Sequence, residues 1–93
     1  MATVSLRIPS VLRNLTNGQE TISVSAGTVE QAIAALEAGN PGIKARICDD
    51  AGKVKKFVNV FVGEEDIRFL DGLATVLKDG DLLDIVPAIA GGR

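Results

Sequence analysis

At 93 residues the chain is the size of one domain, and its abundant Val, Ile and Leu suffice for one core without a metal or a disulfide. It has no His and a single cysteine, Cys48, so it can form neither a Ser-His-Asp triad, nor a Cys-His pair, nor a structural zinc site, and we expect no enzyme. A net charge of −2, three aromatic residues and no long apolar run argue against nucleic-acid and membrane partners. The lone cysteine and the absence of a signal peptide predict a cytoplasmic protein.

Two alternating segments open the chain. In residues 4–8 apolar and polar side chains alternate, which predicts a half-buried strand that ends at Pro9. The pair Asn17-Gly18 is a strong turn signal, and residues 21–25 alternate again. Together these features predict an N-terminal β-hairpin.

The most regular helical pattern starts at Thr28. Thr28 and Gln31 have the spacing of a capping box, in which each side chain satisfies a free amide at the start of a helix. Apolar residues then recur every three or four positions and form one stripe. Gly39 is expected to end the helix in the left-handed conformation, so we predict a helix over residues 29–38. One further helical turn is predicted between residues 43 and 47.

The second half of the chain is predicted to be mostly strands. Residues 57–62 are β-branched or aromatic except at Asn59, which favours a strand. A turn over residues 63–66 leads to a short returning strand, predicted at 67–69. The last strand is predicted at 82–86.

The alternation of the last strand also predicts which side chains face the core. Leu83 and Ile85 are expected to point inward and Val86 outward. Segregated strands with one strong helix predict an α+β protein, in which the helix packs across one face of a sheet.

The end of the chain has no turn signal and no further strand after Pro87. It contains two adjacent glycines, Gly91 and Gly92, which let the backbone approach another backbone closely. Six residues from Pro87 reach at most about 20 Å when extended. We therefore predict a domain over residues 1–87 and a flexible tail over 88–93. The tail is either a frayed terminus or an arm that delivers a C-terminal carboxylate to a partner.

Three segments, in this order, resemble the small sulfur carriers of the MoaD/ThiS family. They are the strand 57–62, the acidic turn and Ile67-Arg68-Phe69 that follow it, and the run from Asp79 through Pro87 to the diglycine. The resemblance covers essentially the whole chain and is greatest to the carriers that serve cysteine biosynthesis. It implies a ubiquitin-like β-grasp fold, with a mixed sheet of four to five strands and one main helix packed across it.

The resemblance also implies a function. An adenylyltransferase of the ubiquitin-activating type would use ATP to adenylate the carboxylate of Gly92, and sulfur would then replace AMP to give a thiocarboxylate. A sulfur-acceptor synthase would take up that sulfur. The carrier itself would bind no cofactor or metal and supply no catalytic residue. The residues that would thread the partner's active site are Ala88, Ile89, Ala90 and Gly91.

One residue departs from the family pattern, because Arg93 follows the diglycine. While Arg93 remains attached, Gly92 has no free carboxylate to be adenylated. Either a peptidase removes Arg93, which would add a metallopeptidase to the partners, or Arg93 is a cloning remnant. The residues leave both alternatives open.

Docking surfaces are expected around the base of the tail. Between Glu64 and Asp84, seven carboxylates stand against two cations, which would suit a basic groove on a partner. A solvated acidic face is the alternative, and the basic residues between 44 and 56 are expected to be solvated. The residues assigned to docking are Phe57, Phe61, Asp81, Asp84 and Val86, with Asp81 and Asp84 as the acids nearest the tail.

Other functions stay open at this point. The chain is also compatible with the small subunit of molybdopterin synthase, with a protein modifier whose Gly92 forms isopeptide bonds to lysines, and with an interaction domain that has an inert tail. Cys48 is a further candidate, as a persulfide carrier. A loop cysteine without a nearby His is more often incidental.

Overall fold

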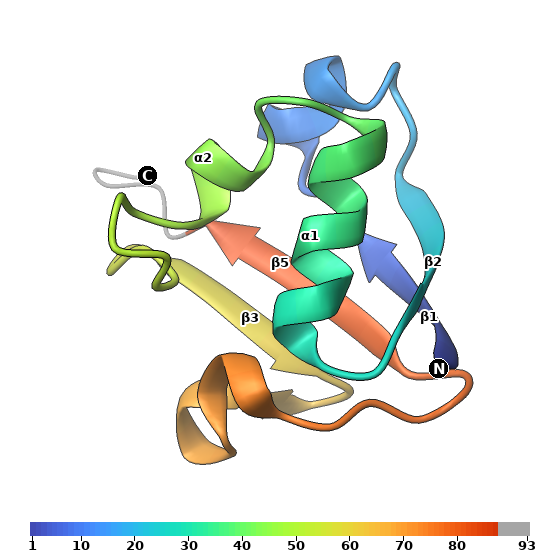
Figure 1. Cartoon of the computed structure of the whole chain (residues 1–93). Coiled ribbons are helices and arrows are strands. Elements are labelled where there is room, and N and C mark those ends of the chain that lie inside the picture. The colour runs from blue at the N-terminus through green and yellow to red at the C-terminus, as the bar shows by residue number, and fades with distance from the viewer. Residues whose placement is uncertain (88–93) are drawn as a thin grey trace.

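In the part of the chain that the structure describes, five strands form one mixed sheet, and helix α1 lies across one of its faces (Figure 1). The computed structural model describes residues 1–87. The strands follow the order β2-β1-β5-β3-β4, with β1 and β5 parallel and the other neighbours antiparallel. The elements are β1 (Ala2–Arg7), η1 (Ser10–Leu15), β2 (Thr21–Ala26), α1 (Val29–Gly39), α2 (Lys44–Ile47), β3 (Val58–Val62), β4 (Glu65–Asp66), η2 (Ile67–Phe69), η3 (Gly72–Ala74) and β5 (Leu82–Pro87).

The N-terminal hairpin is confirmed. Strands β1 and β2 pair antiparallel from Ala2 opposite Ala26 to Arg7 opposite Thr21. Asn17 has a φ of 55° and Gly18 a φ of 82°, the left-handed conformations for which an Asn-Gly pair is suited. The 3₁₀ helix η1 between the strands was not predicted.

Helix α1 begins as its sequence predicts. The Gln31 amide donates to the Thr28 hydroxyl at 3.3 Å, while the Gln31 side-chain oxygen accepts from the Gly27 amide at 2.7 Å. The reciprocal bond of the capping box therefore reaches one residue further back than expected. The buried stripe consists of Val29, Ala32, Ile33 and Leu36.

The prediction that Gly39 ends α1 in the left-handed conformation is wrong. Gly39 is the last helical residue, and the left-handed glycine is Gly42, with a φ of 100°. The helix ends because the Asn40 side chain donates to the Leu36 carbonyl at 3.2 Å and the Glu37 carboxylate accepts from the Gly42 amide. These two bonds turn the chain toward α2, whose single helical turn is confirmed.

The returning strand predicted at residues 67–69 lies earlier in the chain. Glu65 and Asp66 form β4, and residues 67–69 form the 3₁₀ helix η2. The Asp66 carboxylate accepts from the Arg68 amide at 2.8 Å and so caps η2, while Ile67 is buried. A local cap and one buried anchor therefore end the strand after two residues.

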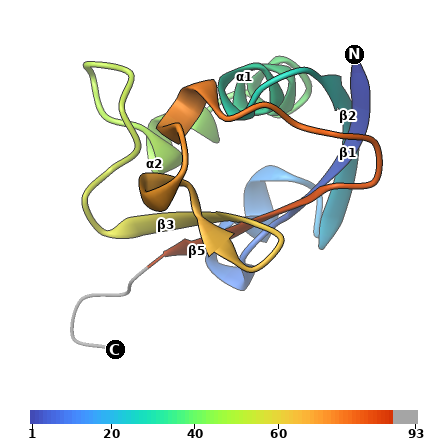
Figure 2. The same cartoon turned by 90° about the horizontal axis from the view of Figure 1, so that it is seen from below.

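Helix α1 and the sheet form two layers (Figure 2), and the core between them is aliphatic. Leu83 and Ile85 are buried in it, and Val86 on the other face is 38% exposed, which confirms the predicted register of β5. Among residues 1–87, the buried core contains no phenylalanine. The aromatic side chains therefore lie outside it.

Candidate docking face at the base of the tail

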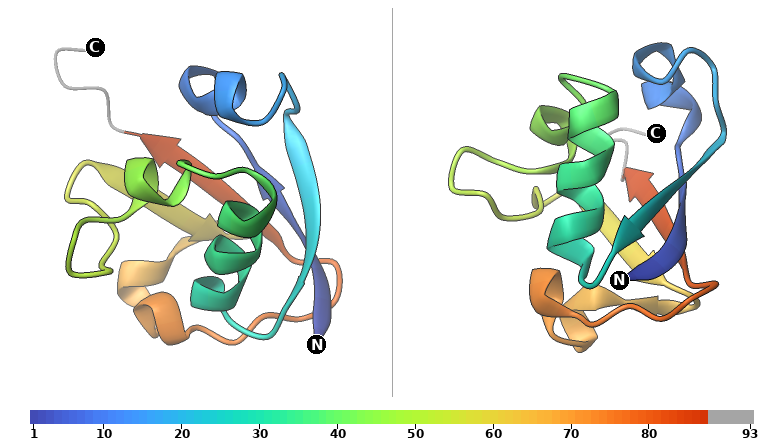
Figure 3. Two further views of the ribbon diagram at one scale, coloured as in Figure 1. Left: turned by 45° about the horizontal axis from the view of Figure 1, so that its top comes forward. Right: turned by 45° about the vertical axis from the view of Figure 1, so that its right-hand side comes forward.

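Strand β5 lies between β1 and β3 and carries the chain out of the sheet at Pro87, which pairs with Val58 (Figure 3). The predicted tail, Ala88, Ile89, Ala90, Gly91 and Gly92 with Arg93, lies outside the described residues. What the structure describes is the base from which the tail leaves and the surface around it.

Four of the five predicted docking residues lie on the sheet face that is turned away from α1, or directly beside it. Val86 pairs with Asn59, and Asp84 lies between Phe61 on β3 and Arg7 on β1. Phe57 directly precedes β3, and its side chain is 58% exposed. We call this surface, made of Phe57, Asn59, Phe61, Asp84 and Val86, the outer face.

Asp81 is not part of the outer face, and the prediction that it lies near the tail is wrong. It precedes β5, so about 20 Å of extended strand separates it from the end of β5. Its carboxylate accepts from the Lys78 amide at 2.8 Å, and its carbonyl accepts from the Ser5 amide at 3.0 Å. Asp81 therefore has a structural role in the turn before β5.

The other acids are also distant from the base of the tail. Glu65 pairs with Val62, whose partner on β5 is Leu83 at the start of that strand. The expectation that acidic residues surround the tail base is therefore wrong, apart from Asp84. Lys55 and Lys56, which precede β3, lie closer to the base of the tail. The Lys56 ammonium lies 5.7 Å from the ring centre of Phe57, so this surface is basic and aromatic.

Arg68 holds the start of β3 and was missed in the sequence. Its Nη2 donates to the carbonyls of Val58, Lys56 and Lys55 at 2.8, 3.2 and 3.3 Å, and its Nη1 donates to the Asn59 side chain at 2.6 Å. Strand β4 pairs only with the end of β3, so the start of β3 has β5 on one side and, among the described residues, no strand on the other. The guanidinium, with its fork of donors, satisfies those carbonyls. No local pattern could reveal this, because Arg68 reaches a strand about ten residues earlier.

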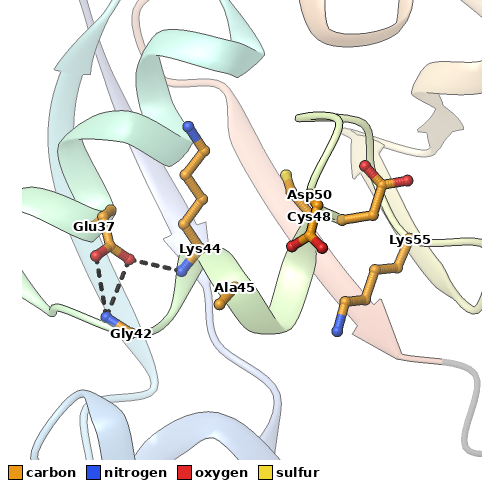
Figure 4. A pocket seen from close by; sticks show the side chains of 8 residues that line it. Glu37, Gly42, Lys44, Ala45, Cys48, Asp50 and Lys55 are labelled. Atoms are coloured by element: carbon orange, nitrogen blue, oxygen red, sulfur yellow. Dashed lines mark hydrogen bonds between the residues drawn. The ribbon is translucent and has the colours of Figure 1, made fainter.

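A separate open hollow of about 550 Å³ lies between the end of α1, α2 and the loop before β3 (Figure 4). In it the Glu37 carboxylate accepts from the Lys44 amide at 2.8 Å and from the Gly42 amide at 3.1 Å. These bonds lower the pKa of Glu37, and the bond from the Lys44 amide has the larger effect. Burial raises the pKa of the Cys48 thiol, and Lys44 opposes that shift only partly. A protonated, buried thiol gives no support to a persulfide role.

Within residues 1–87, no group of three or more His, Cys, Asp or Glu side chains is placed to hold a metal ion. No helix in this part of the chain has the length and apolar character needed to cross a bilayer.

The chain has a β-grasp sheet, and its C-terminal segment leaves from an inner strand. This arrangement defines a class of small ubiquitin-like proteins. The model of the ThiS family matches residues 6–92, so the match ends at Gly92 and leaves Arg93 outside. The chain is 46% identical over 91 residues to the sulfur carrier protein CysO of Mycobacterium tuberculosis, covering 96% of this chain and 98% of that protein. This chain belongs to the ThiS family.

Two further likenesses bear on function. The fold matches the crystal structure of the Amycolatopsis orientalis BexX/CysO complex with a TM-score of 0.90 and 43% identity, over 96% of this chain and 99% of that chain. Small archaeal modifier protein 3 of Haloferax volcanii is 42% identical over 65 residues, 70% of each chain. The whole-length relatives are small protein carriers rather than catalysts.

Proposed function

We propose that this protein carries sulfur as a thiocarboxylate on Gly92. A Gly92 carboxylate oxygen attacks the α-phosphorus of ATP on an activating enzyme, and pyrophosphate leaves. A sulfur nucleophile then attacks the acyl carbon of the adenylate and AMP leaves. The thiocarboxylate donates its sulfur to an enzyme that makes cysteine or a related metabolite, in the cytoplasm where ATP is at hand. The whole-length likeness to a sulfur carrier, with a family match that ends at Gly92, carries this proposal.

The activating enzyme is the partner whose site must admit the tail. A resting carboxylate is a poor electrophile, and the mixed anhydride with AMP supplies a good leaving group, so the carrier needs no acid, base or metal of its own. Its contribution is to present the tail in a fixed place. The outer face supports this role, because Phe57 and Val86 offer exposed apolar surface beside the point where the tail leaves.

Arg93 sets a condition on the mechanism. An amide bond from Gly92 to Arg93 removes the carboxylate that ATP must activate. We therefore propose that a peptidase, of the metallopeptidase kind among the expected partners, exposes Gly92 wherever the chain carries Arg93. The family match up to Gly92 supports this order of events.

Intact-mass analysis tests the proposal. The chain that ends at Gly92 is incubated with its purified activating enzyme, ATP and sulfide, beside the chain that keeps Arg93 and a Gly92→Ala variant. We expect the first to gain the mass of one oxygen exchanged for sulfur, and the other two to stay almost unchanged. Thiocarboxylate on a chain whose mass shows Arg93 still attached would overturn the mechanism.

A modifier function is the second candidate, favoured by the likeness to small archaeal modifier protein 3. In that case Gly92 would be found in isopeptide bonds to lysine side chains of other proteins. Mass spectrometry of tryptic digests from cells distinguishes the two functions. Trypsin cleaves after Lys78, so a modifier would leave residues 79–92 on the lysines of its targets, whereas a carrier leaves no such remnant.

A further inference from the structure

The last two residues of β5 form the base of the tail, and their partners on β3 are Asn59 and Val58. Both backbone groups of Val58 face away from β5, because its amide donates to the Lys55 carbonyl at 3.0 Å and its carbonyl accepts from Arg68 at 2.8 Å. Pro87, which lies opposite Val58, has no amide hydrogen to donate. No backbone hydrogen bond therefore joins Val58 to Pro87.

Asn59 and Val86 are the last pair that backbone hydrogen bonds can join. Backbone groups alternate in direction along a strand, so those of Asn59 face β5 while those of Val58 face the opposite edge of β3. Among the described residues, no strand covers that edge at this point. The sheet thus holds the base of the tail through one pair, and the position of that pair depends on what supports the edge of β3.

The side chain that supports this edge is Arg68. Its Nη2 donates to the Val58 carbonyl and its Nη1 donates to the Asn59 side chain at 2.6 Å, so one guanidinium holds both partners of the tail base. Two further bonds, to the carbonyls of Lys55 and Lys56, hold the turn that leads into β3. Because the donors of a guanidinium form a rigid planar fork, these bonds fix the direction of the strand as well as its place.

The guanidinium is held in position before any partner binds. One oxygen of the Asp66 carboxylate accepts from the Arg68 amide at 2.8 Å, and the other lies 3.9 Å from Arg68 Nη1. Ile67 between them is buried and anchors η2 to the core. Asp66 also pairs with Phe61 further along β3, so η2 is tied to the same strand that Arg68 supports.

We propose that Arg68 is a positioning residue for the tail, because it fixes the two residues of β3 that hold the point where the chain leaves the sheet. This rests on the proposed function, in which a Gly92 carboxylate oxygen must reach the α-phosphorus of ATP. Gly92 lies five residues beyond Pro87, so a docked carrier has a set length of chain with which to reach that atom. Opening of the last pair changes both that length and its starting point. A misplacement of about 1 Å is enough to slow a reaction about a hundredfold.

The rate of pyrophosphate release in a single turnover tests the proposal, with the chain that ends at Gly92, ATP and purified activating enzyme in excess. Arg68→Ala is expected to lower the maximal rate about tenfold. It should change the enzyme concentration that gives half of that rate less than threefold, because the carrier still docks while fewer bound carriers present Gly92 to ATP. Arg68→Lys keeps the charge without the fork and should recover little of the rate.

Thr75→Ala is the matched control for a general loss of stability. The Thr75 hydroxyl is buried, donates to the Gly72 carbonyl at 2.7 Å and accepts from the Asp71 amide at 3.1 Å. The Thr75 carbonyl accepts from the Val29 amide, so this turn is tied to α1 and not to the start of β3. Thr75→Ala should lower the melting temperature and leave the maximal rate within about twofold of the parent, at a temperature where all variants are folded.

Hydrogen exchange of the Val86 amide reports on the base of the tail without any enzyme. This amide faces Asn59, so it should exchange about tenfold faster in Arg68→Ala than in the parent, and faster than in Thr75→Ala. Unchanged exchange at Val86 in Arg68→Ala would overturn the proposal, whatever the enzyme does. An unchanged rate of pyrophosphate release would overturn it too, and so would an equal loss of rate in Thr75→Ala. A parent chain that releases no pyrophosphate would contradict the proposed function, and the exchange at Val86 would then decide whether Arg68 fixes the tail base.

Discussion

The Glu37 side chain, which comes from α1, caps the start of the short helix α2. Its carboxylate accepts from the backbone amides of Lys44 and Gly42, which no hydrogen bond within α2 could satisfy. Both bonds favour the ionised carboxylate, and its pKa is accordingly lowered. The ionised carboxylate of Glu37 thus links the end of α1 to the start of α2.

Stability should therefore depend on the protonation of Glu37. The pKa is lower in the folded chain than in the unfolded one, so this contribution to the free energy of unfolding is present above the unfolded pKa and lost as pH falls through the folded pKa. We expect Glu37→Gln to be less stable than the parent at neutral pH, and the difference to shrink toward about pH 3. Urea unfolding at both pH values measures it. A difference that stays constant with pH would contradict this account.

Cys48 should react slowly with thiol reagents while the protein is folded. Burial raises the pKa of the thiol, so little thiolate is present near neutral pH. Alkylation by iodoacetamide should be much slower in the native chain than in the urea-unfolded chain at the same pH. Cys48→Ala should form thiocarboxylate at the parent rate. A slower Cys48→Ala variant would revive the persulfide alternative.

At the scale of elements, one side chain from η2 holds the edge of β3 that is turned away from β5. Arg68→Ala removes the donors from three backbone carbonyls and from Asn59. We expect the free energy of unfolding to fall by about 1–3 kcal/mol, since hydrogen bonds to a charged donor are lost. Amide hydrogen exchange should rise across residues 55–60 more than across β1.

Arg46→Ala is the matched control, because Arg46 is exposed on α2. It should leave both the stability and the exchange of β3 almost unaltered. Arg68→Lys should rescue little, because one ammonium cannot reach three carbonyls and Asn59 together. Full rescue by Lys would show that charge alone matters at this position.

The elements that could be predicted from the sequence are those that a single segment determines. The hairpin, α1 and β5 follow from the spacing of apolar residues in single segments, such as the inward Leu83 and outward Val86. Helix η2 and the reach of Arg68 depend on which strands become neighbours. Asp81 lies far from Pro87 because the five residues between them are extended in β5, a distance that follows from the predicted strand itself.

Across the whole molecule, charge and aromatic side chains are arranged along β5. Lys55, Lys56 and Phe57 lie near the end of β5, and Glu64 and Glu65 lie near its start. The chain measures 36 Å in its longest dimension. The basic residues beside the tail base and the acidic residues at the start of β5 are therefore held apart by the length of that strand.

The division into domain and tail gives the last prediction. Every strand and helix described, and the whole buried core, lies within residues 1–87. A chain that ends at Pro87 should therefore keep the melting temperature of the full chain to within a few degrees, because no buried apolar surface is removed from the described core. It should form no thiocarboxylate at all. It should still bind the activating enzyme, more weakly than the full chain, through the outer face. Calorimetry measures the melting temperature and the binding constant on the same preparation. A large drop in melting temperature would mean that residues 88–93 pack against the domain, and the tail would then have to be released before any enzyme could take it up.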